Sequence, residues 1–295
     1  MDPHVEIVHR IAPGAALVRR WPLRGGVSAH VEALELALPD GTTRRVVVRR
    51  HGAAHWKALT RDVTVVEYQL LSALSAAGLA VPKPLLVETG SELLGSPFFV
   101  MEHVDGAPEL DPSELPSALV QMAEYLYLVH TLTVDVALPP REDPFAGALS
   151  FLAESDPVCE ALHSLSSRAP TSTLVHGDYW PGNVLWKAGK LVAVLDWEDA
   201  AYGDPVSDLA GCRLELLWKY GASAAEAFSE HYLSLAQLET TRLPVWELYA
   251  ASAAVASMSD WGLLPEREAD MRNKAQTVIA AARATLLGTA GATQR

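Results

Sequence analysis

The chain has 295 residues, of which 49% are hydrophobic and 20% are charged, so it is long enough for two lobes that each bury a core. Its formal net charge of -13 excludes a surface built to neutralise the phosphates of nucleic acids or of anionic lipids, and suits a neutral or cationic small ligand. Because Cys159 and Cys212 are its 2 cysteines, a disulfide framework and a four-ligand zinc site are also excluded.

Neither end of the chain contains a recognisable targeting or membrane segment. The N-terminal stretch MDPHVEIVHR carries Asp2 and Glu6 and has no apolar core, unlike a secretory signal. Near the C-terminus, TVIAAARATLLG is interrupted by Arg283 and is too short to span a bilayer. We therefore expect a cytoplasmic protein whose partner is a small molecule, with no nucleic acid and no membrane.

The first part of the chain is predicted to form a sheet followed by a helix. Between Leu17 and Arg50, strand-like runs are separated by turn residues, and the runs AHVEALELAL and RRVVVRR flank the turn PDGT as a hairpin would. The run from Ala58 to Ala77 then has apolar residues at helical spacing. It is followed by Gly78, a typical residue at a helix C-terminus.

A change of pattern near residue 105 predicts a boundary between two lobes. The strand-like runs PLLVETG and PFFVMEHV come before Asp105 and Gly106, whereas the segment Ser113–Thr131 and most later segments have a helical pattern. Short strands are predicted in the second part at TLVHG, NVLWK and LVAVLDW. We expect an α+β fold with a β-rich N-terminal lobe, 1–104, and a mostly helical C-terminal lobe, 105–295.

The stretch LVHGDYWPGNVLWKAGKLVAVLDWE, residues 174–198, places three polar side chains next to strand ends: Asp178, Asn183 and Asp196. Singly, each is an ordinary turn residue. Phosphoryl transfer, however, needs an oriented acceptor hydroxyl and a metal ion that neutralises phosphate charge. We predict that Asp178 orients the hydroxyl and takes its proton, while Asn183 and Asp196 bind magnesium through hard oxygen atoms.

These motifs resemble the aminoglycoside phosphotransferase and choline kinase-like family, whose signature H-G-D-x-x-x-x-N is followed by a strand and I-D-[WF]-E. The chain reads HGDYWPGN, then LDWE, then GDPVSDLA from Gly203 to Ala210. The resemblance covers most of the chain. It implies a two-lobed protein-kinase-like fold and transfer of the γ-phosphoryl group of ATP or GTP, with Mg²⁺, to the hydroxyl of a small molecule.

The same resemblance implies nucleotide-binding residues in the N-terminal lobe. In VVVRR, Arg49 stands where the family has a phosphate-binding lysine or arginine, with Arg50 as an alternative, and Glu67 on the following helix would hold it. Backbone groups would contact the phosphates at PLRGGVS and the purine edge at PFFVMEHVDG. The residues implied in these backbone contacts are Gly25, Gly26, Ser28, Glu102 and Val104.

Other residues near the motifs have expected structural roles or are left open. Asp208 is expected to accept hydrogen bonds from the backbone around His176 to Asp178 and so to hold that loop rigid, and His176 and His130 are interpreted as structural. Several aromatic and acidic residues would either line an acceptor site or simply pack within the helices. These are Tyr179, Trp180, Glu215, Trp218, Asp260 and Trp261.

The leading hypothesis is a kinase that acts on an aminoglycoside-like or other antibiotic. The alternatives are a metabolic kinase of an amino alcohol or sugar-like metabolite, and a catalytically silent nucleotide-binding regulatory protein. A protein kinase is disfavoured because Asp196-Trp197-Glu198 is followed within a few residues by GDPVSDLA, without a long activation segment or an A-P-E motif. No oligomeric state is predicted.

Overall fold

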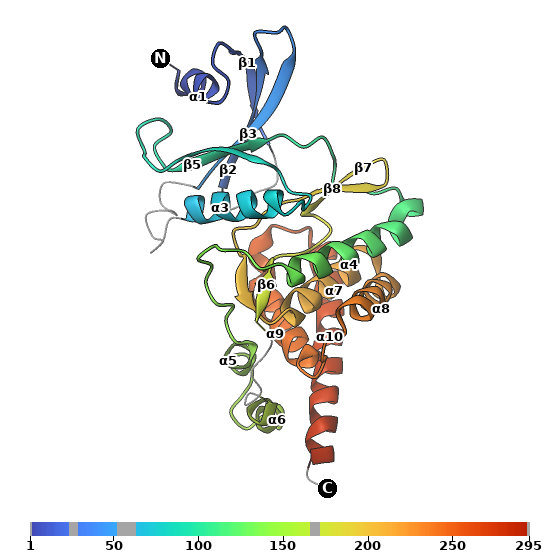
Figure 1. Cartoon of the computed structure of the whole chain (residues 1–295). Helices are drawn as coiled ribbons and strands as arrows, with labels where there is room; N and C mark the ends of the chain where they lie inside the picture. The colour runs from blue at the N-terminus through green and yellow to red at the C-terminus, as the bar shows by residue number, and fades with distance from the viewer. Residues whose placement is uncertain (1, 24–28, 52–62, 166–171, 294–295) are drawn as a thin grey trace. The chain divides into compact units, whose positions relative to one another are not determined.

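The structure is a computed structural model that describes residues 2–23, 29–51, 63–165 and 172–293 (Figure 1). The chain divides into two compact units, and each is described by itself below. The first unit consists of Met1–Ala107, Val134–Ala137 and Val184–Glu198. The second unit consists of Pro108–Thr133, Leu138–Asn183 and Asp199–Arg295.

The first unit is built on an antiparallel sheet of 5 strands in the order β1-β2-β3-β5-β4. The strands are β1 (Ala16–Pro22), β2 (Ala29–Ala37), β3 (Thr43–His51), β4 (Pro84–Glu88) and β5 (Phe98–Glu102). The predicted hairpin is confirmed, because β2 and β3 pair in register from Ala29 opposite His51 to Ala37 opposite Thr43. Gly41 in the turn has a φ of 85°, a conformation that favours glycine.

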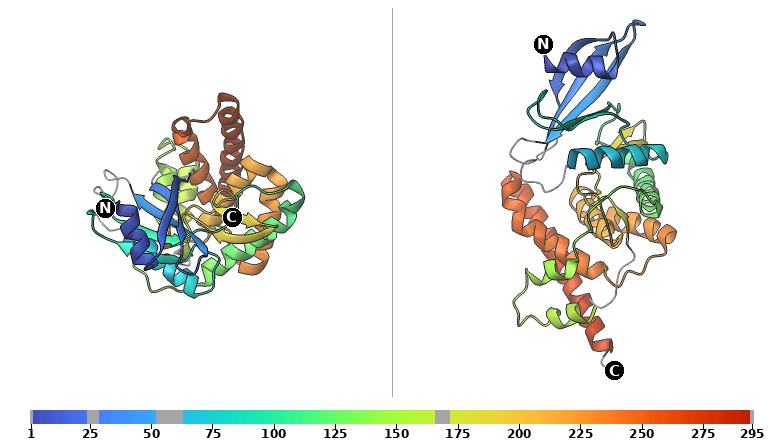
Figure 2. Two further views of the ribbon diagram at one scale, coloured as in Figure 1. Left: turned by 90° about the horizontal axis from the view of Figure 1, so that it is seen from above. Right: turned by 60° about the vertical axis from the view of Figure 1, so that its left-hand side comes forward.

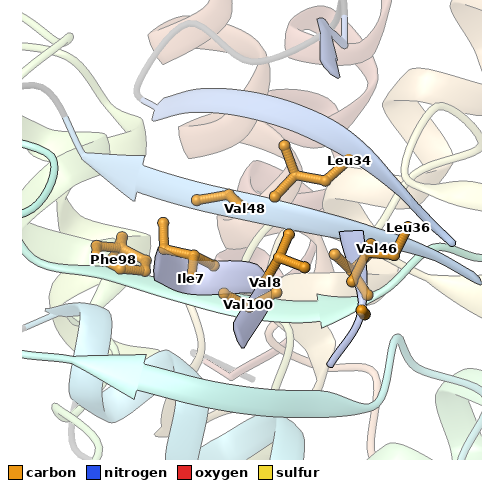
Figure 3. Close-up of a cluster of buried hydrophobic side chains, with 9 residues drawn as sticks. Ile7, Val8, Leu34, Leu36, Val46, Val48, Phe98 and Val100 are labelled. Carbon is orange, nitrogen blue, oxygen red and sulfur yellow. The ribbon is translucent and has the colours of Figure 1, made fainter. Parts of the chain in front are cut away.

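One face of this sheet is covered by the helix α1 (Pro3–Ile11), as Figure 3 shows. The buried side chains of this cluster come from the helix and from alternate positions of three strands: Ile7, Val8, Leu34, Leu36, Val46, Val48, Phe98 and Val100. The sequence analysis does not predict this helix. Its start is nevertheless marked, because Asp2 accepts a hydrogen bond from the backbone N–H of His4 at 2.9 Å and Pro3 follows directly.

The helix α3 (Val63–Ala76) lies against the opposite face of the sheet. Successive side chains of a strand point to opposite faces, so Val47 and Arg49 of β3 face away from α1. On this side the ring of Tyr68 in α3 meets the ring of Phe99 in β5 edge to face, with centroids 6.5 Å apart. The predicted helix is confirmed for its described part, whereas its expected start at residues 58–62 lies outside the described residues.

The hairpin of β7 (Val184–Lys187) and β8 (Lys190–Val194) also belongs to the first unit. The backbone N–H of Val194 donates to the carbonyl of Ala80 at 2.8 Å, and the backbone groups of Trp186 and Ala107 bond to each other. The first unit therefore includes a segment that lies far beyond residue 104 in the sequence. This hairpin carries Asp196 into the β-rich unit.

The second unit is mainly helical. Its helices are α4 (Leu115–Thr131), α5 (Pro144–Leu149), α6 (Val158–Leu165), α7 (Val206–Tyr220), α8 (Ala222–Ala236), α9 (Leu243–Ser257) and α10 (Pro265–Thr293), with short 3₁₀ turns at η1 (Pro112–Glu114) and η2 (Met258–Trp261). The strands β6 (Thr173–Val175) and β9 (Ala201–Gly203) pair antiparallel. The long helices α9 and α10 lie side by side (Figure 2). Among the described helices, none has the length and apolar character needed to cross a membrane.

Candidate active site

The loop after β6 begins with a glycine that the geometry requires. Gly177 has a φ of 87°, and a Cβ at this position would collide with the backbone carbonyl of Asp199. Only glycine adopts this conformation and tolerates this close approach without strain. Gly177 thus allows the chain to turn sharply and present Asp178 directly after the strand.

Asp208 at the start of α7 holds this loop. Its two carboxylate oxygens accept hydrogen bonds from the backbone N–H groups of His176, at 2.7 Å, and of Gly177, at 2.9 Å. The predicted bracing role of Asp208 is thereby confirmed. His176 Nδ1 accepts in turn from the N–H of Asp178 at 3.2 Å, so both ends of the turn are fixed.

His130 in α4 has the structural position expected for it. Its Nε2 lies 3.1 Å from the Asp208 carboxylate and its Nδ1 lies 2.6 Å from the hydroxyl of Tyr232. Burial alone would raise the pKa of Asp208, but the hydrogen bonds from His130 and from the His176 backbone hold this pKa below its usual value. Asp208 therefore remains a carboxylate, which is the form that can accept from two N–H groups.

Asn183 fixes the side chain of Asp178. The amide nitrogen of Asn183 donates to the backbone carbonyl of Asp178 at 2.9 Å and to its carboxylate at 3.0 Å. With the nitrogen used in this way, the amide oxygen of Asn183 is the atom that can bind a cation. The two predicted residues of this loop, Asp178 and Asn183, are thus in direct contact. The amide oxygen of Asn183 is the kind of atom that binds Mg²⁺, which fits the metal-binding role predicted for this residue.

Arg49 forms the centre of a buried charge cluster in the first unit. Its Nε donates to Glu67 at 3.2 Å, and its Nη2 donates to Asp196 and to Glu198, each at 2.7 Å. Arg49 is 7% exposed and Glu67 is 3% exposed. Arg50, on the other face of the strand, donates instead to the carbonyl of Leu94 at 3.4 Å. The ion pair expected between Arg49 and Glu67 is present, and Arg49 is the arginine that points toward Asp196.

The electrostatics of this cluster keep Arg49 charged. Burial disfavours the cation, but the carboxylates of Glu67, Asp196 and Glu198 raise the pKa of Arg49 above its usual value. Burial raises the pKa of Glu67, and the neighbouring Arg49 opposes this rise. Glu198 is the member of the cluster that the sequence analysis does not assign, although the motif LDWE contains it.

Asp196 has an uncommon backbone conformation, with a φ of 64° in the left-handed region. Such strain is often found at functional positions, where surrounding contacts maintain it. Here the next residue anchors the turn, because Trp197 Nε1 donates to the carbonyl of Val194 at 3.1 Å. The described residues contain no group of three or more His, Cys, Asp or Glu that would hold a metal by themselves. Mg²⁺ commonly binds to one or two protein ligands together with substrate phosphates, and the carboxylate of Asp196 is a ligand of the type it prefers.

The remaining residues predicted to bind the nucleotide are only partly described. Glu102 ends β5, where its N–H donates to the carbonyl of Lys83 at 2.8 Å and its carboxylate accepts from Arg44 at 2.9 Å. Val104 follows in the segment after the strand. Gly25, Gly26 and Ser28 lie outside the described residues.

A cavity of about 190 Å³ opens beside Asp178 within the second unit. Aromatic and charged side chains line it, and they come from the loop after β6, from α7, α9 and η2, and from the segment before α5. Prominent among them are Arg141, Asp178, Trp180, Glu215, Trp218, Trp246, Tyr249 and Trp261. Among the residues for which the sequence analysis left it open whether they line an acceptor site, Asp260 does not line this cavity. Arg141, Trp246 and Tyr249 were missed, because no motif marks them.

Glu215 has a sequence signal that identifies it in retrospect. In α7, Gly211, Leu214, Glu215 and Trp218 share one helical face and all line the cavity, so Glu215 is the acid among these four positions. Burial and the nearby Asp178 raise the pKa of Glu215 to about 7, while Arg267 and Lys219 partly offset this rise. In the described part of the chain, Glu215 makes no hydrogen bond or ion pair.

Comparison with known proteins defines the class. Residues 23–247 match the phosphotransferase enzyme family, and the chain belongs to it. The class is that of phosphotransferase enzymes, which is the class that the motifs predict. Viomycin phosphotransferase of Streptomyces vinaceus is 27% identical over 243 residues, which cover 71% of this chain and 78% of that protein.

Two further comparisons bear on the fold and on the length of relatives. Choline kinase LicA of Streptococcus pneumoniae has 18% identity and a TM-score of 0.62, with 94% of this chain and 97% of that chain covered, which confirms the two-lobed kinase-like α+β fold. Acyl-CoA dehydrogenase family member 11 of Rattus norvegicus is 31% identical over 178 residues, or 52% of this chain. The match spans 23% of that much longer protein.

Proposed function

We propose that this phosphotransferase transfers the γ-phosphoryl group of ATP or GTP, with Mg²⁺, to a hydroxyl group of a small molecule. The main support is the position of Asp178, which is fixed by Asn183 and by the braced loop and opens onto a cavity that can receive an acceptor. The solved complex of LicA with AMP, a structure of the same fold, supports nucleotide binding. Asp178 is also the residue at the acid position of the HGD motif.

In the proposed reaction the acceptor oxygen attacks the γ-phosphorus, the bond from phosphorus to the β–γ bridging oxygen breaks, and the nucleoside diphosphate leaves. The hydroxyl proton passes to Asp178, which orients the acceptor beforehand. Arg49 would bind phosphate oxygens through its planar guanidinium, held by Glu67. Magnesium, held by Asn183 and Asp196, would neutralise charge on the phosphates.

We further propose backbone contacts to the nucleotide from Gly25, Gly26, Ser28, Glu102 and Val104. Glu102 and Val104 belong to the first unit, whereas Gly25, Gly26 and Ser28 are outside the described residues. Their support is the family resemblance of the motifs PLRGGVS and PFFVMEHVDG. The proposal makes the first unit the nucleotide-binding part and the second unit the acceptor-binding part.

The acceptor is proposed to be an antibiotic or a small metabolite such as an amino alcohol. Viomycin phosphotransferase and amicoumacin kinase of Bacillus subtilis, which is 24% identical over 215 residues, are relatives whose names support an antibiotic. A catalytically silent regulatory protein is less well supported, because Asp178, Asn183 and Asp196 are all present and the loop that holds Asp178 is fully braced.

The test is release of ADP or GDP by purified protein with MgATP or MgGTP, across aminoglycosides, macrolides, amino alcohols and sugars. Stimulation by one chemical class is expected, and it would identify that class as the acceptor. Nucleotide binding with Mg²⁺ but no acceptor-dependent release across the panel would favour the regulatory alternative. Absence of nucleotide binding would contradict the proposal.

A further inference from the structure

Glu215 is an acidic residue at the wall of the acceptor cavity. It lies on the face of α7 that lines the cavity together with Asp178, and within the described residues it makes no hydrogen bond or ion pair. A carboxylate removed from water is unfavourable unless a cation or donors compensate it. The most direct compensation is a charged group of the ligand.

The neighbours of Glu215 are aromatic and suit a cation. Trp218 and Trp261 meet edge to face with ring centroids 6.0 Å apart, and both line the cavity. The Nε1 of Trp218 donates to the carbonyl of Met271 at 2.9 Å. A ligand would therefore contact the ring of Trp218 and not its N–H group. Tryptophan is the best aromatic partner for an ammonium group.

The charges around the cavity also favour a cationic ligand. Asp178, Asp208 and Glu215 are acids of the lining, whereas Arg141 is its basic residue. Arg141 donates to the carbonyl of Gly177 at 3.3 Å, which turns part of its guanidinium toward the loop that carries Asp178. Asp208 is used in bracing, so Glu215 is the acid whose charge remains for a ligand.

We propose that Glu215 is a specificity-determining residue that binds the ammonium group of a small amino alcohol, with Trp218 and Trp261 beside it, while the acceptor hydroxyl faces Asp178. This inference rests on the proposed kinase function. The cavity volume of about 190 Å³ is below the range of about 300–1,000 Å³ typical of pockets for drug-sized molecules. The part of the acceptor that enters is therefore smaller than a multi-ring aminoglycoside.

The test compares acceptors of equal length that differ in one group: amino alcohols, neutral diols and hydroxy acids, each with MgATP and with MgGTP. For wild-type protein, amino alcohols are expected to have the lowest KM. Glu215→Gln, which keeps the shape but removes the charge, is expected to raise the KM for amino alcohols about 10- to 100-fold, with a much smaller change in kcat and no change for diols. The control Glu230→Gln changes an exposed acid of α8 and should leave these values unaltered.

Equilibrium binding keeps the inference separate from the kinase function. Calorimetry with 2-aminoethanol, in the presence of a non-hydrolysable ATP analogue, is expected to show binding that is lost in Glu215→Gln and retained in Glu230→Gln. Turnover of diols or hydroxy acids in preference to amino alcohols, with a KM insensitive to Glu215→Gln, would overturn the inference and leave the kinase function standing. Amine binding that depends on Glu215 without any phosphate transfer would support the subsite and contradict the kinase function.

Discussion

At the scale of single residues, Asp208 is a buried carboxylate that holds a loop in place through hydrogen bonds. Its carboxylate is almost fully buried, at 3% exposure, yet each oxygen accepts a hydrogen bond from the loop that carries Asp178. Hydrogen bonds of this kind stabilise the ionised form and are stronger than neutral ones. In the proposed reaction, Asp208 would act by holding the loop that carries Asp178.

Replacement of this carboxylate should be costly. In Asp208→Asn, an amide N–H₂ would confront backbone N–H donors, so at least one donor is left without an acceptor. We expect a loss of about 2–4 kcal/mol in the free energy of unfolding, measured by urea denaturation, together with reduced turnover. Asp260→Asn, at an exposed acid of η2, serves as the control. Equal stability of the two variants would contradict the bracing role.

Glu215 should make stability depend on pH. The pKa of this carboxyl is about 7 in the folded chain, against 4.5 for the ordinary side chain. The folded state therefore holds a proton more tightly than the unfolded state, and stability is lost as the pH rises from 4.5 to about 7. Above pH 7, Glu215→Gln should be more stable than the wild type by up to about 3 kcal/mol, and near pH 4.5 the two should be alike.

Denaturation curves of both proteins at the two pH values provide this measurement. A constant difference in the free energy of unfolding across the range would mean that Glu215 is ionised at an ordinary pKa and well solvated. In the same comparison, bound 2-aminoethanol should raise the free energy of unfolding of the wild type more than that of Glu215→Gln, because an ammonium ligand stabilises the ionised carboxylate.

The sequence analysis left Arg49 and Arg50 as alternatives, and the structure decides between them. In β3, Arg49 and Arg50 are adjacent, so the pleat alone places them on opposite faces, and only Arg49 shares a face with Val47. The motifs identify Asp178, Asn183 and Asp196 as candidates by their order along the chain, and the roles of these residues stay predictions. Arg141 and Tyr249 line the cavity through tertiary packing of distant segments, which leaves no local pattern to detect.

At the scale of elements, the sheet was predictable because its strands alternate and its turns contain glycine. The hairpin of β2 and β3 follows from the PDGT turn between two alternating runs. The helix α1 was missed although Asp2 and Pro3 form a start signal, since the run of only 9 residues is too short for a firm helical period. The inclusion of the β7–β8 hairpin in the first unit depends on long-range bonds to Ala80 and Ala107.

The loop between β6 and Asp178 provides an element-scale prediction. Gly177→Ala introduces a Cβ that meets the backbone of Asp199 at a φ of 87°, so the turn must shift. We expect a loss of stability of about 1–3 kcal/mol and a fall in kcat, because Asp178 moves with the loop. Gly288→Ala is the control, since a Cβ there meets nothing within 4 Å and the residue lies within α10, outside the cavity lining. The account of this turn fails if the two variants lose the same stability.

At the scale of the whole molecule, the proposed reacting groups are divided between the two units. Arg49, Glu67 and Asp196 belong to the first, whereas Asp178 and Asn183 belong to the second. Each group has a defined support within its own unit: the ion-pair cluster around Arg49 in one and the braced loop in the other. The proposed reaction would therefore need residues of both units. The order of the motifs does not follow this division, because Asp196 comes after Asp178 and Asn183 in the sequence but belongs to the first unit.

The central claim is that Asp178 takes the acceptor proton, and turnover of Asp178→Asn tests it most directly. Diphosphate release with the best acceptor should fall about 10²- to 10⁴-fold in this variant. The affinity for the magnesium nucleotide, measured by calorimetry, should stay near that of the wild type, because Arg49 and Asp196 are intact. Unchanged turnover, or a loss of nucleotide affinity as large as the loss of turnover, would contradict the role assigned to Asp178.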